Sequence, residues 1–175
     1  MIKTKTYFCE SIVKKFREKL KVEEPKNEKY DLEKSFTKPV RVYIDTCSLL
    51  RPNSANFISE LAEVAEKQNQ KITIFKSVIR ELEKISKNQP QMKKRVNDIL
   101  NKLYELKQKD LLEMLEGKEK LFSDPNFLEA LIHDLRTTNV IIVSNDYQLG
   151  KAARRISEDI RCAVYTKYKL QVIKV

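Results

Sequence analysis

Short apolar runs alternate with amphipathic segments along most of the chain. Residues 40–44, 72–75 and 140–144 are runs rich in β-branched and aromatic side chains, which favour β-strands. Residues 162–165 and 170–173 are weaker runs of the same kind and are predicted to be closing strands. Apolar residues fall on both faces of these strands, which is typical of a parallel sheet covered on two sides.

Helices are predicted between the strands, where apolar residues recur every three or four positions. Each predicted helix follows a capping residue or a proline, and the starts are near Asn53, Ser77, Pro90, Asp124 and Asp146. Strands that alternate with helices predict an α/β fold around a central, mainly parallel sheet.

The first 38 residues are predicted to form an extension outside this domain. Apolar residues from Phe8 to Leu20 recur at helical spacing with Lys and Arg between them, which indicates a basic amphipathic helix on which a protein partner could dock. The rest of residues 1–38 is polar and is predicted to be a linker. The domain then spans residues 39–175, and residues 90–122 form a Lys-rich helical insert within it.

Composition narrows the classes of function. The longest apolar runs are far shorter than a membrane span, and the first residues lack a signal-peptide core, so we expect no membrane association. Three scattered cysteines without metal-binding spacing favour a reduced, cytoplasmic compartment. The single histidine, His133, excludes most zinc sites.

The chain carries 35 Lys and Arg against 25 Asp and Glu, a net charge of +10. Residues 67–109 hold twelve of the basic residues and only four acids. A surplus of this kind favours a nucleic acid as the partner. Lys93, Lys94 and Arg95, at the start of the insert, are the predicted nucleic-acid contacts.

Four carboxylates follow strands or open helices. Asp45 and Asp146 come at the ends of predicted strands, where parallel sheets form ligand crevices. Glu81 lies in the first turns of the helix after residues 72–75, and Asp124 opens the helix that leads into residues 140–144. We therefore expect the four acids to converge. Asp134, ten residues after Asp124, is expected to face elsewhere and to be solvated.

Each acid except Asp45 also has an ordinary structural interpretation. Asp124 and Asp146 are suited to cap helices, and Glu81 to complement a helix dipole. The functional interpretation therefore rests on the four acids together. Carboxylates that lie close together repel one another, and a bound Mg²⁺ or Mn²⁺ usually neutralises this repulsion. Such a metal can activate water for phosphodiester hydrolysis.

Four segments resemble, in order, the motifs of PIN-domain nucleases. Asp45 and Thr46, followed by small polar residues and a hydrophobic pair, resemble the first motif. Residues 75–82 resemble the second, and the helix opened by Asp124 resembles the third. Residues 140–149, with Ser and Asp two positions apart, match the fourth most closely. The resemblance covers about residues 40–175.

The resemblance implies a PIN-like three-layer α/β/α fold and a metal-dependent endoribonuclease. Its catalytic residues and its Mg²⁺ or Mn²⁺ ligands would be Asp45, Glu81, Asp124 and Asp146. Thr46 and Ser144 would orient the carboxylates through their hydroxyls. The substrate would be single-stranded or structured RNA. The toxins of bacterial toxin–antitoxin pairs are one branch of the family, although this chain is longer than they usually are.

Two departures from the family leave the substrate open. Pro125 stands where the family often has another acid or a small residue, and the insert at residues 90–122 is long. The alternatives are a catalytically silent PIN-like module that binds RNA or a protein, and a structure-specific DNA nuclease. The oligomeric state also stays open, a homodimer included.

Overall fold

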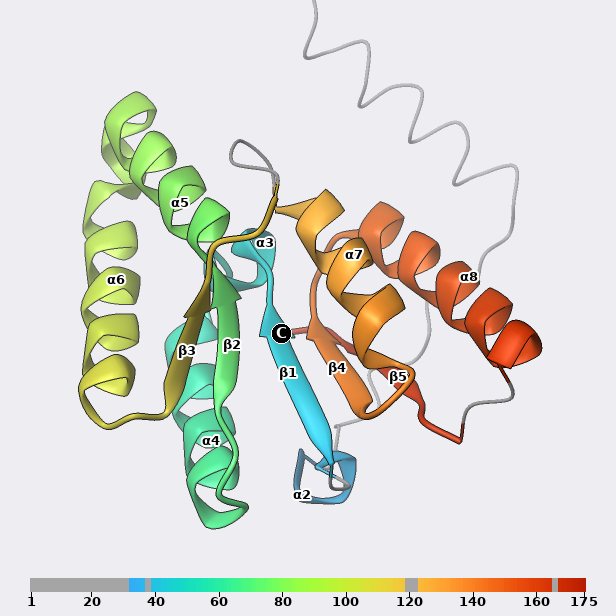
Figure 1. The fold of residues 1–175 in the computed structure, drawn as a ribbon. Helices are drawn as coiled ribbons and strands as arrows, with labels where there is room; N and C mark the ends of the chain where they lie inside the picture. Colours follow the sequence, from blue (N-terminus) through green and yellow to red (C-terminus); the bar gives the residue numbers. More distant parts are fainter. Residues whose placement is uncertain (1–31, 37–38, 119–122, 165–166) are drawn as a thin grey trace, which may run out of the picture.

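The computed structural model describes residues 32–36, 39–118, 123–164 and 167–175. Five parallel strands form one sheet in the order β3-β2-β1-β4-β5 (Figure 1). Their bounds are β1 Val40–Ile44, β2 Ile72–Phe75, β3 Leu112–Leu115, β4 Asn139–Val143 and β5 Leu170–Ile173. The predicted amphipathic helix at residues 8–20 lies outside the described residues.

Helices cover both faces of the sheet, so the predicted three-layer α/β/α fold is confirmed (Figure 1). One layer holds α7 (Asp124–Asp134) and α8 (Tyr147–Val164), and the other holds α4 (Ser54–Lys67) and α6 (Lys93–Gln108). The short α3 (Thr46–Leu49) and α5 (Lys76–Asn88) begin at the carboxyl edge of the sheet, at the top of Figure 1. A 3-10 turn, η1 (Pro90–Met92), joins α5 to α6.

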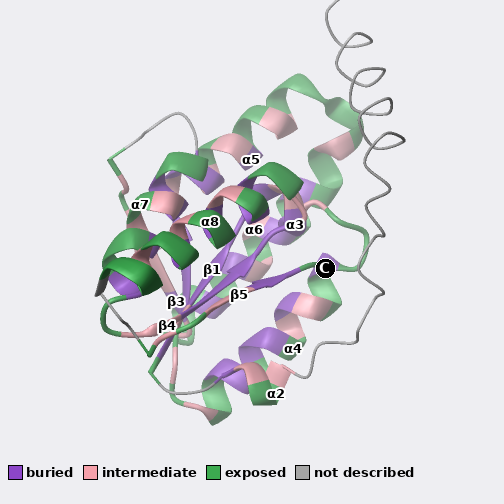
Figure 2. Cartoon of the chain, turned by 90° about the vertical axis from the view of Figure 1, so that its right-hand side faces the viewer, coloured by how far each residue is buried: buried purple, intermediate pink, exposed green. Residues whose placement is uncertain are grey.

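The strands at the centre of the sheet are the most deeply buried (Figure 2). All four residues of β2 are buried, whereas three of the four in the edge strand β3 are only half-buried. Tyr43, Phe75 and Phe127 stack in the core with ring centroids 5.2 to 6.1 Å apart. Their contact fixes α7 against the sheet, because Phe127 belongs to α7 and the other two to strands.

The register of the sheet aligns the ends of its two central strands. Ile44 of β1 pairs with Val143 of β4, and the Asp45 N–H donates to the Val143 carbonyl at 3.0 Å. The residues that follow these strands, Asp45 and Ser144, therefore lie side by side at the carboxyl edge.

Two predictions of secondary structure are wrong. Residues 162–164 are the last residues of α8 and not a strand, because no proline or further glycine follows Gly150 to end the helix earlier. The insert at residues 90–122 is only partly helical, since it contains β3. The chain turns at Asp110, whose φ of 57° is the left-handed conformation that ends helices, and then pairs with β2.

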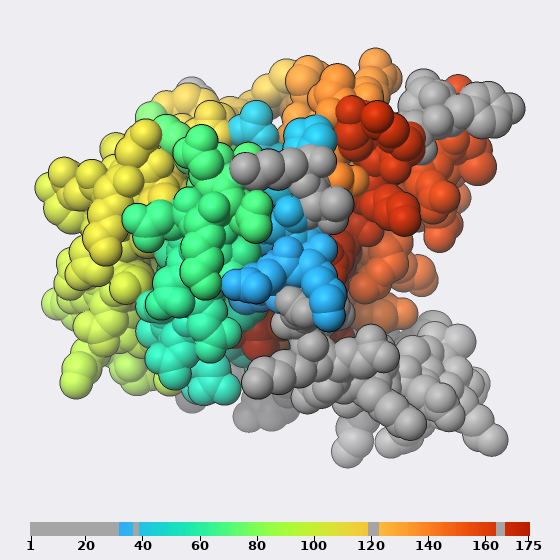
Figure 3. Space-filling model, turned by 90° about the horizontal axis from the view of Figure 1, so that it is seen from below, coloured from blue at the N-terminus to red at the C-terminus, as the bar shows by residue number. Residues whose placement is uncertain are grey.

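Part of the predicted linker packs on the domain. The one-turn helix α2 (Leu32–Ser35) lies against α4 at the amino ends of the strands (Figure 3). Phe36 is buried in the core, and the Gln171 side chain donates to the Ser35 hydroxyl at 2.9 Å. The folded unit thus begins before residue 39.

Asp134 faces away from the predicted site, as expected, but its predicted solvation is wrong. Its carboxylate is buried and accepts a hydrogen bond from the Tyr43 hydroxyl at 2.6 Å. The guanidinium of Arg41 lies 3.7 Å from it and also bonds to Glu113. Burial and this hydrogen bond raise the pKa of Tyr43. Asp134 therefore ties the end of α7 to the sheet.

None of the helices in the described ranges is long and apolar enough to cross a membrane.

Candidate functional site at the carboxyl edge

Asp45 is the most buried of the four candidate acids, with 4% of its surface exposed. Its Oδ1 accepts the N–H of Thr46 at 2.7 Å, which caps α3. Its Oδ2 accepts the Cys47 thiol at 2.7 Å and the Ser144 hydroxyl at 3.0 Å. Burial raises the pKa of Asp45, these three donors lower it, and the charge of Glu81 adds to the rise. The carboxylate is thus held rigidly, in one orientation.

Glu81 connects the first and third predicted motifs. Its carboxylate accepts a hydrogen bond from the Thr46 hydroxyl and, at 2.8 Å, from the N–H of Ser123. Thr46 follows Asp45 and Ser123 precedes Asp124, so one side chain from α5 joins the segments of both aspartates. Glu81 lies in the second turn of α5, and its position is explained by these bonds rather than by the helix dipole.

Asp146 does cap a helix, as its structural interpretation predicts. Its Oδ1 accepts the N–H groups of Gln148 and Leu149 at 2.6 and 3.0 Å, in the first turn of α8. Its own N–H donates to the Ser144 hydroxyl at 3.0 Å, and that hydroxyl donates to Asp45. The cap uses one carboxylate oxygen, and Oδ2 remains for a ligand.

Asp124 is the first residue of α7, next to the N-cap Ser123. Partial burial and the charges of Asp45, Asp146 and Glu81 raise its pKa to about 6. Asp124 is the only one of the four acids that is exposed as a residue. All four predicted acids are therefore close enough to interact at one edge of the sheet.

The arrangement supplies oxygen donors of the kind that Mg²⁺ and Mn²⁺ prefer. Among the described residues, no three Asp, Glu, His or Cys side chains already surround a common point as metal ligands do. The reason lies in the bonds above, because Glu81 is turned toward Thr46 and Ser123, and Asp45 Oδ2 toward Cys47. The set fits a hard cation chemically, and Glu81 would have to rotate to join a shared ion.

Sequence patterns missed several residues that shape this edge. The Cys47 thiol was not expected beside Asp45, where burial and then the charge of Asp45 raise its pKa to about 11. Asn126 of α7 donates to the Ser77 hydroxyl at 3.2 Å and so joins α7 to α5. Asn145 accepts from the Ser48 hydroxyl at 2.8 Å. The only signal for these contacts in the sequence is that the three residues lie within or next to the motifs.

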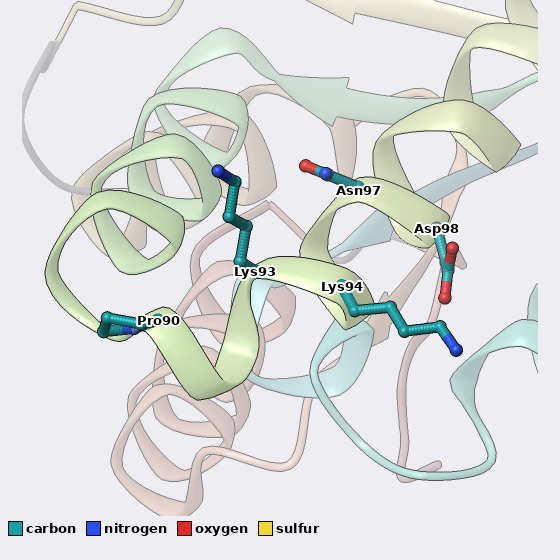
Figure 4. Close-up of a pocket in the computed structure, with 5 residues that line it drawn as sticks. All are labelled: Pro90, Lys93, Lys94, Asn97 and Asp98. Carbon is teal, nitrogen blue, oxygen red and sulfur yellow. The ribbon is translucent and has the colours of Figure 1, made fainter.

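The predicted nucleic-acid contacts lie on another part of the surface. Lys93 and Lys94 are exposed and line an open hollow of about 430 Å³ with Pro90, Asn97 and Asp98. The two lysines point in different directions from the start of α6 (Figure 4). Arg95 donates to the Leu50 carbonyl at 3.1 Å, so it also holds α6 against the end of α3. The hollow is separate from the carboxylates and lacks their concentration of charge.

No protein-family model matches the sequence, and a search of curated proteins finds no match.

Proposed function

We propose that the chain is a metal-dependent endoribonuclease similar to the PIN-domain nucleases. One observation carries the proposal: a continuous chain of hydrogen bonds and backbone links joins the four acids. It runs from Asp146 through Ser144 to Asp45, and from Thr46 through Glu81 to Ser123, beside Asp124. Repulsion among acids costs folding free energy, so a cluster supplied by four separate segments favours a bound cation over a structural role.

The acids Asp45, Glu81, Asp124 and Asp146 would hold Mg²⁺ or Mn²⁺. When bound, such an ion supplies an activated water and charge stabilisation for phosphodiester hydrolysis. The chain itself orients the carboxylates: Ser144 and Cys47 fix one oxygen of Asp45, and Thr46 fixes Glu81. Asp45 is the most buried of the four acids, and Asp124 is the most exposed.

RNA is the proposed substrate, in keeping with the net charge of +10 and with the exposed Lys93 and Lys94. The hydroxyl-rich, histidine-poor edge needs no other cofactor for this chemistry. We place the enzyme in the cytoplasm, since the described thiols of Cys47 and Cys162 are free. A more specific version of this proposal is that the enzyme acts as the toxin of a toxin–antitoxin pair. A DNA nuclease would use the same acids.

The test is an incubation of the full chain with labelled RNA and labelled DNA, with Mn²⁺ and with EDTA. We expect Mn²⁺-dependent RNA cleavage that Asp45→Asn reduces by at least about 100-fold. Asp159→Asn, a change at an exposed aspartate near the end of α8, is the matched control and should cleave as the wild type does.

Three results would contradict the proposal in distinct ways. Equal cleavage by wild type and Asp45→Asn would show that the carboxylates around Asp45 are not the catalytic site. Cleavage of DNA alone would favour the DNA nuclease. RNA binding without cleavage by any metal-loaded preparation would favour the silent module.

A further inference from the structure

Tyr147 is an aromatic side chain that the core does not use. The aromatic residues Tyr43, Phe75 and Phe127 pack against one another inside the domain. Tyr147 is 51% exposed instead, although it directly follows the candidate site residue Asp146. Part of the Tyr147 ring is therefore available to a ligand beside the candidate site.

The position of Tyr147 relative to the carboxylates is fixed by the start of α8. Asp146 Oδ1 accepts N–H groups from Gln148 and Leu149, on the far side of Tyr147 in the chain. Leu149 is buried in the core. The first turn of α8 is therefore anchored at both its cap and its apolar side, and Tyr147 belongs to that turn, one residue from Asp146.

Two cations continue the same face of α8. Lys151 and Arg154 come four and seven residues after Tyr147, a spacing that places them on one side of a helix. Both are exposed, and neither belongs to an ion pair within the described ranges. After the cap residue Asp146, the next acid along α8 is Glu158.

The side chain of Arg154 points back toward the start of α8. A methyl group built on Gly150 would lie 3.7 Å from Nη1 of Arg154, so the guanidinium reaches back along α8 by about one turn. Side chains on helices generally lean toward the amino end. Tyr147, Lys151 and Arg154 thus lie along one side of α8, here called the α8 face, with the tyrosine next to Asp146 in the chain and the two cations one and two turns further along the helix.

We propose that the α8 face binds an unpaired RNA strand, with a base stacked on Tyr147 and the neighbouring phosphates on Lys151 and Arg154. Stacking platforms flanked by cations are the usual means of holding single strands. A base inside a duplex has both faces covered, so only an unpaired base can stack on Tyr147. This inference rests on the proposed ribonuclease function for its choice of RNA as the ligand.

The test measures binding of a fluorescein-labelled single-stranded RNA to the full chain in EDTA, where cleavage plays no part. Tyr147→Ala should weaken binding about 5- to 100-fold, and Tyr147→Phe should bind within about twofold of wild type, since it keeps the ring. Tyr104→Ala is the matched control, because Tyr104 is 63% exposed on α6 and should not affect binding. Circular dichroism confirms that each variant is folded.

A second arm separates stacking from charge. An RNA with an abasic position next to the scissile bond should bind wild type and Tyr147→Ala equally. Lys151→Ala with Arg154→Ala should reduce the salt dependence of binding, with the slope falling by about 1.4. Duplex RNA should bind wild type more weakly than the single strand and should be unaffected by Tyr147→Ala.

The proposal is overturned if Tyr147→Ala binds single-stranded RNA as well as Tyr104→Ala does, a result that would assign the α8 face to a protein partner. It is also overturned if the loss is equal for single-stranded and duplex RNA. Failure of the ribonuclease proposal looks different: stacking on Tyr147 is retained in EDTA, but no metal produces cleavage.

Discussion

At the scale of single residues, the carboxylate of Asp45 shows how the protein tolerates a buried charge. Three donors, from Thr46, Cys47 and Ser144, offset part of the desolvation that raises its pKa. The Cys47 thiol acts as a donor here and not as a nucleophile, because its own pKa is raised to about 11. The contribution of this hydrogen bond to stability can be measured separately from the contribution of the size of the Cys47 side chain.

Cys47→Ala should lower the free energy of unfolding by about 1–3 kcal/mol, because the buried Asp45 loses a hydrogen bond. Cys47→Ser, which keeps a donor, should remain within about 1 kcal/mol of wild type. Urea unfolding at pH 8 measures both. The loss in the alanine variant should shrink at low pH, where Asp45 is protonated and needs fewer donors. Equal stabilities of the two variants would show that the thiol packs but does not bond.

At the scale of elements, the site depends on how α7 is placed against α5. Asn126 of α7 is buried and donates to Ser77, at the start of α5, near the base of Glu81. Gly117 lies against the same side chain: it has a φ of 69°, and a Cβ there would be 2.5 Å from Cγ of Asn126. Asn126 therefore helps to align the start of α5 with the start of α7. This alignment also places Glu81 relative to Asp124.

Asn126→Ala should cost about 1–3 kcal/mol of stability and reduce Mn²⁺-dependent cleavage, since Asp124 loses its alignment. Gly117→Ala should also destabilise, through both the clash and the positive φ. The double variant should lose less than the two single losses together, because Asn126→Ala removes the clashing atoms. Thermal melts and cleavage rates measure this, with Asn56→Ala, at an exposed position on α4, as control. Simple additivity would mean that the two residues are not in contact.

At the scale of the whole molecule, a basic chain carries an acidic region at the carboxyl edge of its sheet. The chain as a whole has a net charge of +10, and the carboxyl edge of the sheet concentrates four acids. The acids repel one another at neutral pH, so the metal-free protein is destabilised there. The acidic edge attracts a metal cation, and the basic residues elsewhere attract a polyanion.

The pH dependence of stability follows from Asp124, whose pKa is raised from 3.8 to about 6. The folded state holds this proton at a pH where the unfolded state has lost it, so stability falls as pH rises from about 4 to 6.5. Asp124→Asn should match wild type near pH 4 and exceed it by about 1 kcal/mol at pH 7, a value reduced by solvent screening of the exposed side chain.

Added Mn²⁺ should reverse this difference. At 100 times its dissociation constant the ion stabilises the wild type by about 2.7 kcal/mol, and Asp124→Asn should gain less. Thermal melts at pH 4 and pH 7, with and without Mn²⁺, provide the measurement. A wild type with the same response to Mn²⁺ as Asp124→Asn would exclude Asp124 as a ligand.

The basic surface on α6 makes its own prediction. Replacing Lys93 and Lys94 together by Ala should weaken RNA binding and lower the slope of log affinity against log salt by up to about 1.4. Lys107→Ala is the control, because Lys107 is exposed about 20 Å further along α6. An unchanged slope would place the RNA elsewhere, and an effect from Lys107 would indicate binding by net charge alone.

Local pattern explains why much of the fold could be predicted. The strands at residues 40–44, 72–75 and 140–144 are apolar on both faces, and only the interior of a parallel sheet accepts such runs. The edge strand β3 was missed because its half-buried sequence, with Glu113 in it, lacks that pattern. The end of α8 was mistaken for a strand because Cys162 and Val164 are compatible with either structure.

The sequence by itself determined the parallel sheet and the placement of Asp45 and Asp146 after its strands, since alternation of strands and helices leaves few other folds for those residues. Only the tertiary structure decided that Asp134 is buried, that Glu81 bonds to Thr46 and Ser123, and that Tyr147 stays exposed. These outcomes depend on which side chains meet across 35 to 91 residues of chain, and no local periodicity encodes such distances.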